Sequence, residues 1–286
     1  MPRTVEELVE LLDLETIDVN LFRGTQPDTS LQRVFGGQVA AQALVAGART
    51  VEPQKSVHSL HSYFLRPGDP TVPIVYDVER IRDGRSFSTR RVMARQHGHA
   101  IYYMTLSAQV AEDGFDHQDV MPDVAAPADS VDVAELFRTR PGGKGAEWLE
   151  EWAALEMRWV GDSRPGGAIP AGERPSQSRL WIRVRGRIEQ EVLTHQAAFT
   201  YASDLTLLGS TLVPHGTHIG DPRLQSASLD HTIWFHRPFR ADEWLLYDQA
   251  SPSASGARGL AIGRVFTESG VLVATVAQEG LIRMRG

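Results

Sequence analysis

The stretch that most constrains the fold runs from Gly36 to Thr50 and reads GGQVAAQALVAGART. It is long enough for about four helical turns, lacks proline, consists largely of alanine and carries one charge, Arg49. Such a helix is apolar on nearly every face and has to be buried all round. A soluble chain achieves this by curling an antiparallel sheet about the helix, whose small side chains let strands approach closely. We therefore expect a central helix wrapped by strands.

The composition places few further limits on the chain. Its 286 residues suffice for about two domains. A formal net charge of −7 argues against a nucleic-acid partner, and no apolar run has the length of a membrane span. The absence of cysteine excludes disulfides and thiolate chemistry and fits a reducing compartment. The acidic N-terminal residues do not resemble a signal peptide. We expect a cytoplasmic protein.

The first half reads as a helix followed by a folded sheet. Thr4 and Glu7 form a capping box that predicts a short amphipathic helix at the N-terminus. Alternating polar and apolar residues, separated by turn signals, predict strands. The expected strands are residues 17–25, ahead of the buried helix, and then 56–65, 74–82, 86–96 and 100–110.

The second half repeats this order after a linker. Residues 111–130 are acidic and contain Pro122 and Pro127, which indicates a linker, and a helical piece is expected at 131–137. Residues 195–213 predict a second buried helix with one charge, Asp204, in its middle. The expected strands of this half are 155–160 and 179–185 before that helix, and 226–235, 244–251, 258–267 and 271–283 after it.

Constant offsets indicate that one motif occurs twice. The Arg-Pro corner at Pro67 returns at Pro238, 171 residues later, and the turn glycines 84 and 98 return at 256 and 270, each 172 residues later. Phe35 aligns with His195 at the helix starts, and about eleven extra residues fit in the loop 214–225. The predicted domains are 1–110, a linker 111–153, and 154–286. We expect an α+β protein made of two copies of a sheet wrapped around a helix.

The first copy serves as an internal control for the second. At three interior positions the second copy has a polar residue where the first has an apolar one, and such replacements favour a functional site. They are Asp204 for Leu44, Ser228 for Val57 and Gln278 for Leu106. A small gap would instead align Gln278 with Gln109. A structural hydrogen bond remains an alternative for Asp204, and an ordinary strand hydroxyl for Ser228.

Several motifs, taken in order, resemble the acyl-CoA thioesterase II family of double hotdog proteins, from about Phe22 to the C-terminus. They are VFGGQ at 34–38, HSYFLRPG at 61–68, RDGRSF at 82–87, YASDL at 201–205, PHG at 214–216, LDH at 229–231, WFHRPF at 234–239 and AQEG at 277–280. The resemblance implies a double hotdog fold and hydrolysis of fatty acyl-CoA by an aspartate, a threonine or serine, and a glutamine, without a covalent intermediate.

The catalytic residues implied by the resemblance are Asp204, Ser228 and Gln278. Well-known bacterial members have threonine where this chain has Ser228. A carboxylate beside water can act as the base, whereas Gln278 and Ser228 can orient the water or donate to developing charge. We expect the backbone N–H of Gly36 or Gly37 to bind the oxyanion, since helix N-termini present free donors. Close packing of helix on strand is the alternative role for these glycines.

Arginines at matching places in the two copies are candidates for binding the coenzyme A phosphates. We select Arg85 and Arg258 and keep Arg90, Arg91 and Arg264 as further candidates, although solvated strand edges also carry arginine. Histidine pairs such as His58 with His61 lack the carboxylates of a metal site, so we expect no metal. No cofactor is expected beyond coenzyme A as part of the substrate.

Two other functions remain to be compared with hydrolysis. A hotdog enoyl-CoA hydratase would need a histidine about five residues after the aspartate, as the resemblance to that family implies, and position 209 is glycine. A non-catalytic acyl-CoA sensor would use the same pocket, so the sequence leaves it open. An α/β-type serine hydrolase lacks its Gly-x-Ser-x-Gly motif here. We expect an acyl-CoA small molecule as partner, no nucleic acid or membrane, and a homo-oligomer.

Overall fold

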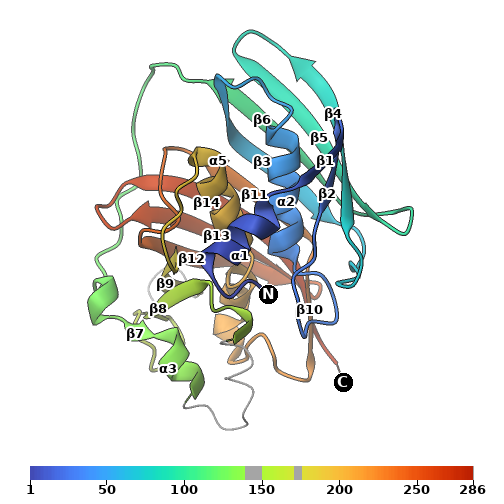
Figure 1. Ribbon diagram of the computed structural model, residues 1–286. Helices are drawn as coiled ribbons and strands as arrows, with labels where there is room; N and C mark the ends of the chain where they lie inside the picture. Colours follow the sequence, from blue (N-terminus) through green and yellow to red (C-terminus); the bar gives the residue numbers. More distant parts are fainter. Residues whose placement is uncertain (139–149, 171–175, 286) are drawn as a thin grey trace.

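The computed structural model describes residues 1–138, 150–170 and 176–285 (Figure 1). The helices are α1 (Val5–Leu12), α2 (Gly36–Ala48), α3 (Val133–Arg138) and α5 (Val192–Ser203), with 3-10 segments η1 (Pro127–Asp129) and η2 (Leu207–His215). The strands before the linker are β1 (Glu15–Asp18), β2 (Leu21–Gly24), β3 (Lys55–Phe64), β4 (Ile74–Asp83), β5 (Phe87–Gln96) and β6 (His99–Val110). The later strands are β7 (Val131–Asp132), β8 (Leu155–Asp162), β9 (Gln177–Val184), β10 (Leu224–Ser228), β11 (Asp230–Phe235), β12 (Leu245–Ser255), β13 (Arg258–Thr267) and β14 (Leu272–Met284).

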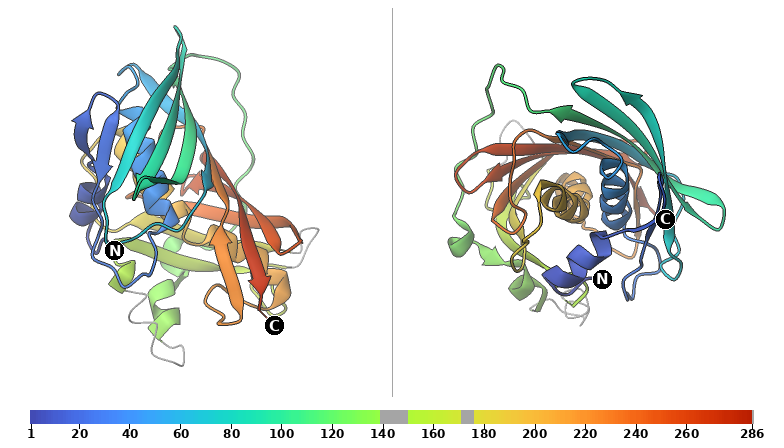
Figure 2. Two further views of the ribbon diagram at one scale, coloured as in Figure 1. Left: turned by 90° about the vertical axis from the view of Figure 1, so that its right-hand side faces the viewer. Right: turned by 45° about the horizontal axis from the view of Figure 1, so that its top comes forward.

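One antiparallel sheet wraps both buried helices. Its strand order is β1-β2-β4-β5-β6-β3-β11-β14-β13-β12-β9-β8-β7, with β10 paired to β14. Figure 2 (right) looks obliquely onto the ends of α2 and α5 and shows the sheet curving around them, with α1 lying across the side that the sheet leaves open. Every residue of α2 from Gly37 to Gly47 is buried, which confirms the helix expected from its alanine-rich sequence. The α+β double hotdog architecture is confirmed.

The two copies meet at β3 and β11 with a symmetric register. His61 pairs with Thr232, and these two residues are themselves 171 apart, the offset found between the copies. The pair of Ser59 with Trp234 is therefore the counterpart of the pair of Tyr63 with Asp230. If every residue is replaced by its counterpart in the other copy, the same pairs are obtained. A pseudo-two-fold axis therefore passes through the His61–Thr232 pair.

Two of the predicted strands are each divided into two in the structure. The strand expected at 17–25 is a hairpin, β1 and β2, which starts two residues earlier. The strand expected at 226–235 is interrupted at Leu229, between β10 and β11. The interruption matches a register shift at His58 in β3, which lies 171 residues earlier, so the irregularity occurs in both copies.

The second buried helix is shorter than predicted. It ends at Ser203, Asp204 forms its C-cap, and the chain continues as the 3-10 segment η2. The Ser203 hydroxyl at the end of the helix donates to the Thr200 carbonyl at 2.9 Å, and such local bonds compete with helix formation. Asp204 therefore lies at a helix end and not in the middle of a helix.

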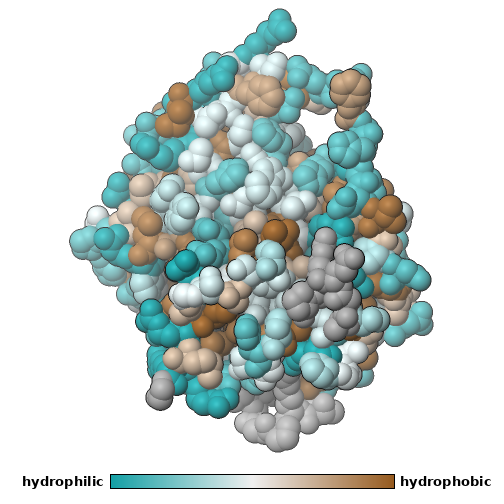
Figure 3. Space-filling model, turned by 180° about the vertical axis from the view of Figure 1, so that it is seen from behind, coloured by the Kyte–Doolittle hydropathy of each residue, from teal (hydrophilic) through white to brown (hydrophobic). Residues whose placement is uncertain are grey.

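The linker lies along the outside of the second copy (Figure 1). Met121 and Val124 pack on an outer cluster formed by Trp181, Leu246 and Phe266, and the Trp181 indole donates to the Ala125 carbonyl at 2.9 Å. Part of the predicted linker, residues 139–149, lies outside the described residues. Figure 3 shows the molecule from behind, with hydrophobic side chains in separate patches among hydrophilic ones.

The close packing of α2 leads to a stability prediction. Ala43 is fully buried, so Ala43→Leu adds three carbons to a filled space and should destabilise the protein by about 1–3 kcal/mol. Urea unfolding would measure this change. The same substitution at the exposed Ala254 of β12 is the control and should cost less than about 0.5 kcal/mol. Equal midpoints for the two variants would contradict the packing described for α2.

Candidate active site

The three polar residues that replace apolar ones meet at one carboxylate. Asp204 ends α5, Ser228 ends β10, and Gln278 lies in β14 with its side chain fully buried. The Ser228 hydroxyl donates to Asp204 Oδ1 at 3.0 Å, and Gln278 Nε2 donates to the same oxygen. Two donors thus fix one carboxylate oxygen, so the orientation of the other oxygen is determined as well.

The N-terminus of α2 faces the other oxygen of this carboxylate. A Cβ placed on Gly36 would lie 2.6 Å from Asp204 Oδ2 and 2.9 Å from the Phe64 ring, so only glycine fits there. Phe35, at the N-cap of α2, provides no side-chain acceptor for the first backbone N–H groups of the helix. The positive end of the α2 dipole and its free donors therefore lie beside the Asp204 carboxylate.

Gly37 has a different environment. A Cβ on Gly37 would lie 2.3 Å from the Tyr201 carbonyl oxygen and 2.5 Å from the Phe35 ring. Tyr201 belongs to α5, so Gly37 permits the close approach of the two helices. The packing alternative considered for the glycine pair therefore describes Gly37, while Gly36 borders the carboxylate.

The strand register supports the internal comparison at two of its three positions. Val57 pairs with Ala108 and Ser228 with Gly280, and Ala108 and Gly280 are 172 apart. In the first copy, Arg90 of β5 pairs with Leu106 of β6. In the second copy, Ala261 of β13 pairs with Gln278 of β14 at the equivalent position. Gln278 therefore corresponds to Leu106, and the alternative alignment with Gln109 is wrong. The third counterpart, Leu44, lies inside α2 and is fully buried.

Two residues near the carboxylate were missed in the sequence. Tyr102 of β6 is buried and its ring lies 5.0 Å from that of Phe64; its hydroxyl lies near Ser62, which acts on its pKa, but forms no hydrogen bond of normal geometry. Burial, together with the Asp204 charge, raises the pKa of the Tyr102 hydroxyl, so the group stays protonated at neutral pH. His231 of β11 is fully buried, and Asp204 is among the groups that act on its pKa. The 171-residue offset aligns His231 with Leu60, a signal that was available in the sequence.

Unpartnered polar atoms gather around Asp204. Among the described residues, five buried side-chain nitrogen or oxygen atoms lack a hydrogen-bond partner, and three belong to this site: the Tyr102 hydroxyl, His231 Nδ1 and Gln278 Oε1. Buried polar groups normally find partners, so such a group is typical of a place that binds something else. The site can thus offer acceptors and a hydroxyl donor to a reacting molecule.

Arg258 lies close to the site in the strand register. Its neighbour Gly259 pairs with Gly280, which pairs in turn with Ser228. The guanidinium is half exposed and forms an ion pair with Glu279 at 3.0 Å. Arg258 therefore lies near the site on the outer side of the sheet.

Arg85 lies far from the site. It lies at the tip of the hairpin formed by β4 and β5. Lys55, the first residue of β3, holds this tip, because its ammonium donates to the Gly84 carbonyl at 2.7 Å. Phe64, which borders Gly36, ends the same strand. Ten residues of strand separate these places by about 30 Å, so the fold does not bring Arg85 to Asp204.

The other candidate arginines take part in ion pairs. Arg90 is fully buried and pairs with Asp83 at 2.7 Å, so it has a structural role. Arg91 pairs with Glu79, and Arg264 with Asp248 and with Asp119. In the described parts of the chain, no three histidine, aspartate or glutamate side chains are grouped to hold a metal ion. No helix there combines the length and apolar character needed to cross a bilayer.

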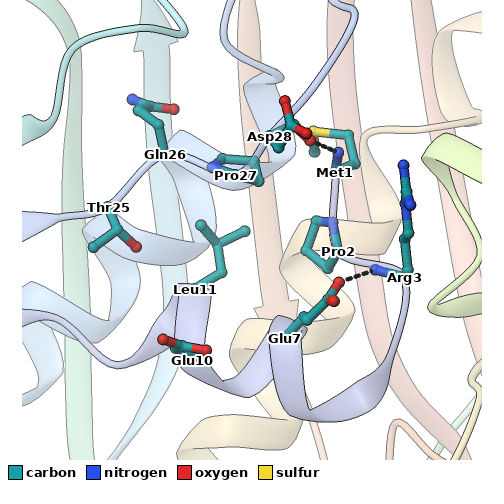
Figure 4. A pocket seen from close by; sticks show the side chains of 10 residues that line it. All are labelled: Met1, Pro2, Arg3, Glu7, Glu10, Leu11, Thr25, Gln26, Pro27 and Asp28. Carbon is teal, nitrogen blue, oxygen red and sulfur yellow. Dashed lines mark hydrogen bonds between the residues drawn. The ribbon is translucent and has the colours of Figure 1, made fainter.

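One cavity lies away from these residues. It has a volume of about 380 Å³ and is formed by α1, the N-terminal residues and residues 25–28 (Figure 4). Its lining carries charges of both signs, from Glu7, Glu10 and Asp28 and from Arg3 and the N-terminal ammonium of Met1, which does not suit a fatty ligand. We therefore rely on the hydrogen-bond geometry around Asp204 to locate the site.

Comparison with known proteins identifies the family. The family model for the acyl-CoA thioesterase N-terminal domain matches residues 25–110, and the acyl-CoA thioesterase model matches residues 158–281. The chain is 38% identical to acyl-CoA thioesterase 2 of Haemophilus influenzae over 99% of both chains. It is 40% identical to human acyl-coenzyme A thioesterase 8, with 96% of this chain and 88% of the human protein covered.

A solved structure extends the likeness to the fold. The crystal structure of an acyl-CoA thioesterase II, TesB2, from Mycobacterium marinum superimposes with a TM-score of 0.83 at 47% identity, covering 98% of this chain and 99% of the other. The matches cover almost the whole chain. They therefore include both copies, the sheet that the copies share and the residues of the site. The chain belongs to the acyl-CoA thioesterase family.

Proposed function

We propose that this protein hydrolyses fatty acyl-CoA thioesters to a carboxylic acid and coenzyme A. The observation that carries the proposal is the Asp204 carboxylate, held by Ser228 and Gln278 at the N-terminus of a buried helix. The names of the relatives, all acyl-CoA thioesterases, support the same reaction. They do not favour the hydratase or the non-catalytic sensor.

Asp204 is the general base of the proposed reaction. Ser228 and Gln278 occupy Oδ1, which leaves Oδ2 free to take a proton from water. Gln278 Oε1 has no partner and can accept the second hydrogen of that water, so one amide orients both the base and the nucleophile. Ser228 holds the carboxylate and does not attack the substrate.

Each step then balances in atoms and protons. The water oxygen attacks the thioester carbonyl carbon while its proton passes to Asp204 Oδ2. The carbonyl oxygen becomes an oxyanion, which the Gly36 N–H and the α2 dipole stabilise. The C–S bond breaks as the carbonyl re-forms, and Asp204 returns the proton to the leaving thiolate. Water is the only second reactant, so the proposed reaction needs no cofactor and no metal.

Arg258 is our candidate for contact with the coenzyme A phosphates. Its register beside Gly280 and Ser228 and its half-exposed guanidinium support this role.

The absence of cysteine from the whole sequence supports a cytoplasmic setting.

We further propose a homo-oligomer formed through the outer face of the sheet at β3 and β11. Apart from Asp230, which pairs with Tyr63, the outward side chains around the pseudo-two-fold axis carry no carboxylate, lysine or arginine, and they include exposed aromatic rings: His61, Tyr63, Tyr103, Thr105, Thr232, Trp234 and Thr275. An acidic chain repels a second copy least at an uncharged strip. Within residues 111–138, Met121 and Val124 of the linker pack on the outer face of the second copy, at Trp181, Leu246 and Phe266 and not on the residues of this strip.

The role of the carboxylate can be tested with Asp204→Asn. Asparagine keeps the size of the side chain but cannot accept the proton, so kcat for thiol release from acyl-CoA should fall at least about a hundredfold. A thiol-trapping assay over a panel of chain lengths measures this. An effect confined to KM, or a wild-type protein that binds acyl-CoA without turnover, would favour the sensor.

The two glycines of α2 should respond differently to alanine. Gly36→Ala places a methyl group against Asp204 Oδ2 and the Phe64 ring, so it should lower kcat of the folded protein at least about tenfold in addition to lowering the free energy of unfolding. Gly37→Ala presses on the Tyr201 backbone and should lower the free energy of unfolding by about 1–3 kcal/mol. Steady-state kinetics and urea unfolding separate the two effects. The reverse assignment would contradict the proposed oxyanion site.

The proposed interface can be tested through Trp234. Its ring is 37% exposed and lies 5.3 Å from the His61 ring, close to the pseudo-two-fold axis. Trp234→Glu adds a charge to the uncharged strip and should shift the sedimentation coefficient to that of a smaller species. Phe115→Ser, at a fully exposed aromatic residue of the linker, is the control and should leave the sedimentation coefficient unchanged.

A further inference from the structure

His231 has an environment that its counterpart lacks. It is fully buried in β11, and the pairing of Thr232 with Ala277 makes it an interior neighbour of Gln278 on the adjacent strand. The first copy has Leu60 at this position, also fully buried. His231 is thus a further interior residue that is polar only in the copy that contains Asp204.

The hydrogen bonds of His231 define its tautomer. Its Nε2 lies 2.9 Å from the hydroxyl oxygen of Ser203, and that hydroxyl already donates its only proton to the Thr200 carbonyl. Nε2 must therefore carry the hydrogen and donate to Ser203. Burial lowers the pKa of the His231 ring, so the ring is neutral at neutral pH and Nδ1 is a bare, unpartnered acceptor.

Ser203 connects this ring to the catalytic carboxylate. It is the last residue of α5 and immediately precedes Asp204, at the point where the helix ends. Its hydroxyl is held by His231, and its carbonyl accepts a hydrogen bond from the Tyr247 hydroxyl at 3.2 Å. Two buried side chains from the sheet thus fix the backbone from which the Asp204 side chain projects.

We propose that His231 is a positioning residue that acts through Ser203 to hold Asp204 in its reactive orientation. The inference rests on the proposed hydrolysis at Asp204. A purely structural role explains the observations less well, because an unpartnered buried nitrogen costs stability that a leucine avoids, as in the first copy. The imidazole is present in the copy whose buried helix ends at the base, and the other copy has Leu60 in its place.

Kinetics of substituted proteins test this role. His231→Leu introduces the residue of the first copy and should lower kcat at least tenfold, with KM within twofold and no loss of stability in urea. His231→Gln keeps an amide donor near the position of Nε2 and should retain more of kcat than His231→Leu. The control is His236→Leu, which removes a similar bond, 2.8 Å from the ring to the Thr275 hydroxyl, at an exposed position; its kcat should be unchanged.

A double-mutant cycle tests the route through Ser203. If His231 acts through this hydroxyl, His231→Leu combined with Ser203→Ala should lower kcat no further than the more harmful single change. Multiplying effects, or a His231→Leu variant with kcat within twofold of the wild type, would overturn the proposal. Asp204→Asn measured alongside separates the two hypotheses: if it retains full turnover, hydrolysis at Asp204 itself is wrong.

The tautomer gives a further test, which is measured on the wild-type protein. In the wild-type protein with ¹⁵N-labelled histidine, the ring assigned to His231 by comparison with His231→Gln should show a neutral imidazole protonated at Nε2. A signal from an Nδ1–H tautomer, or from a charged ring at neutral pH, would contradict the hydrogen bond on which the proposal depends.

Discussion

The meeting of the Asp204 carboxylate with the N-terminus of α2 is the contact on which the rest of the site depends. A carboxylate away from water is costly unless donors surround it. Here Ser228 and Gln278 supply two hydrogen bonds, and the helix dipole supplies a favourable field. This arrangement requires the end of α2 to approach within van der Waals distance of the carboxylate. The glycine at 36 permits that approach, and the small side chains of α2 permit the burial of the whole helix.

Neither copy contains a complete site. The first copy contributes the α2 N-terminus, Phe64 and Tyr102, and the second contributes the base and its donors. The symmetric pairing of β3 with β11 sets the relative position of the copies, so it also sets the distance between the α2 N-terminus and Asp204. The pairing across the pseudo-two-fold axis therefore determines active-site geometry as well as stability.

Most of the fold could be predicted from the sequence because strands with one buried face alternate strictly and their turns carry glycine. The predicted strand 258–267 matches β13 at both ends, and 56–65 matches β3 within a residue. The end of α5 could not be predicted, because leucines recur at 205, 207, 208 and 212 beyond Ser203, and the first glycine comes only at 209. The constant offset between the two copies identified Ser228 and Gln278 as candidates. Such an offset gives no distance between side chains in the folded protein. The position of Arg85 about 30 Å from the site follows only from the direction of β3.

The pseudo-two-fold axis relates the site to an equivalent position in the other copy. Apolar residues replace the polar ones at that position, so the chain has one site and not two. There Val57, Leu60 and Leu106 occupy the positions of Ser228, His231 and Gln278, and all three are buried. Apolar contacts at that position avoid the loss of folding stability caused by buried polar atoms without hydrogen bonds, such as His231 Nδ1 and Gln278 Oε1. A duplicated chain can thus place polar atoms in one half while the other half supplies apolar packing. An identical pair of subunits cannot do this, because every destabilising polar group would occur twice.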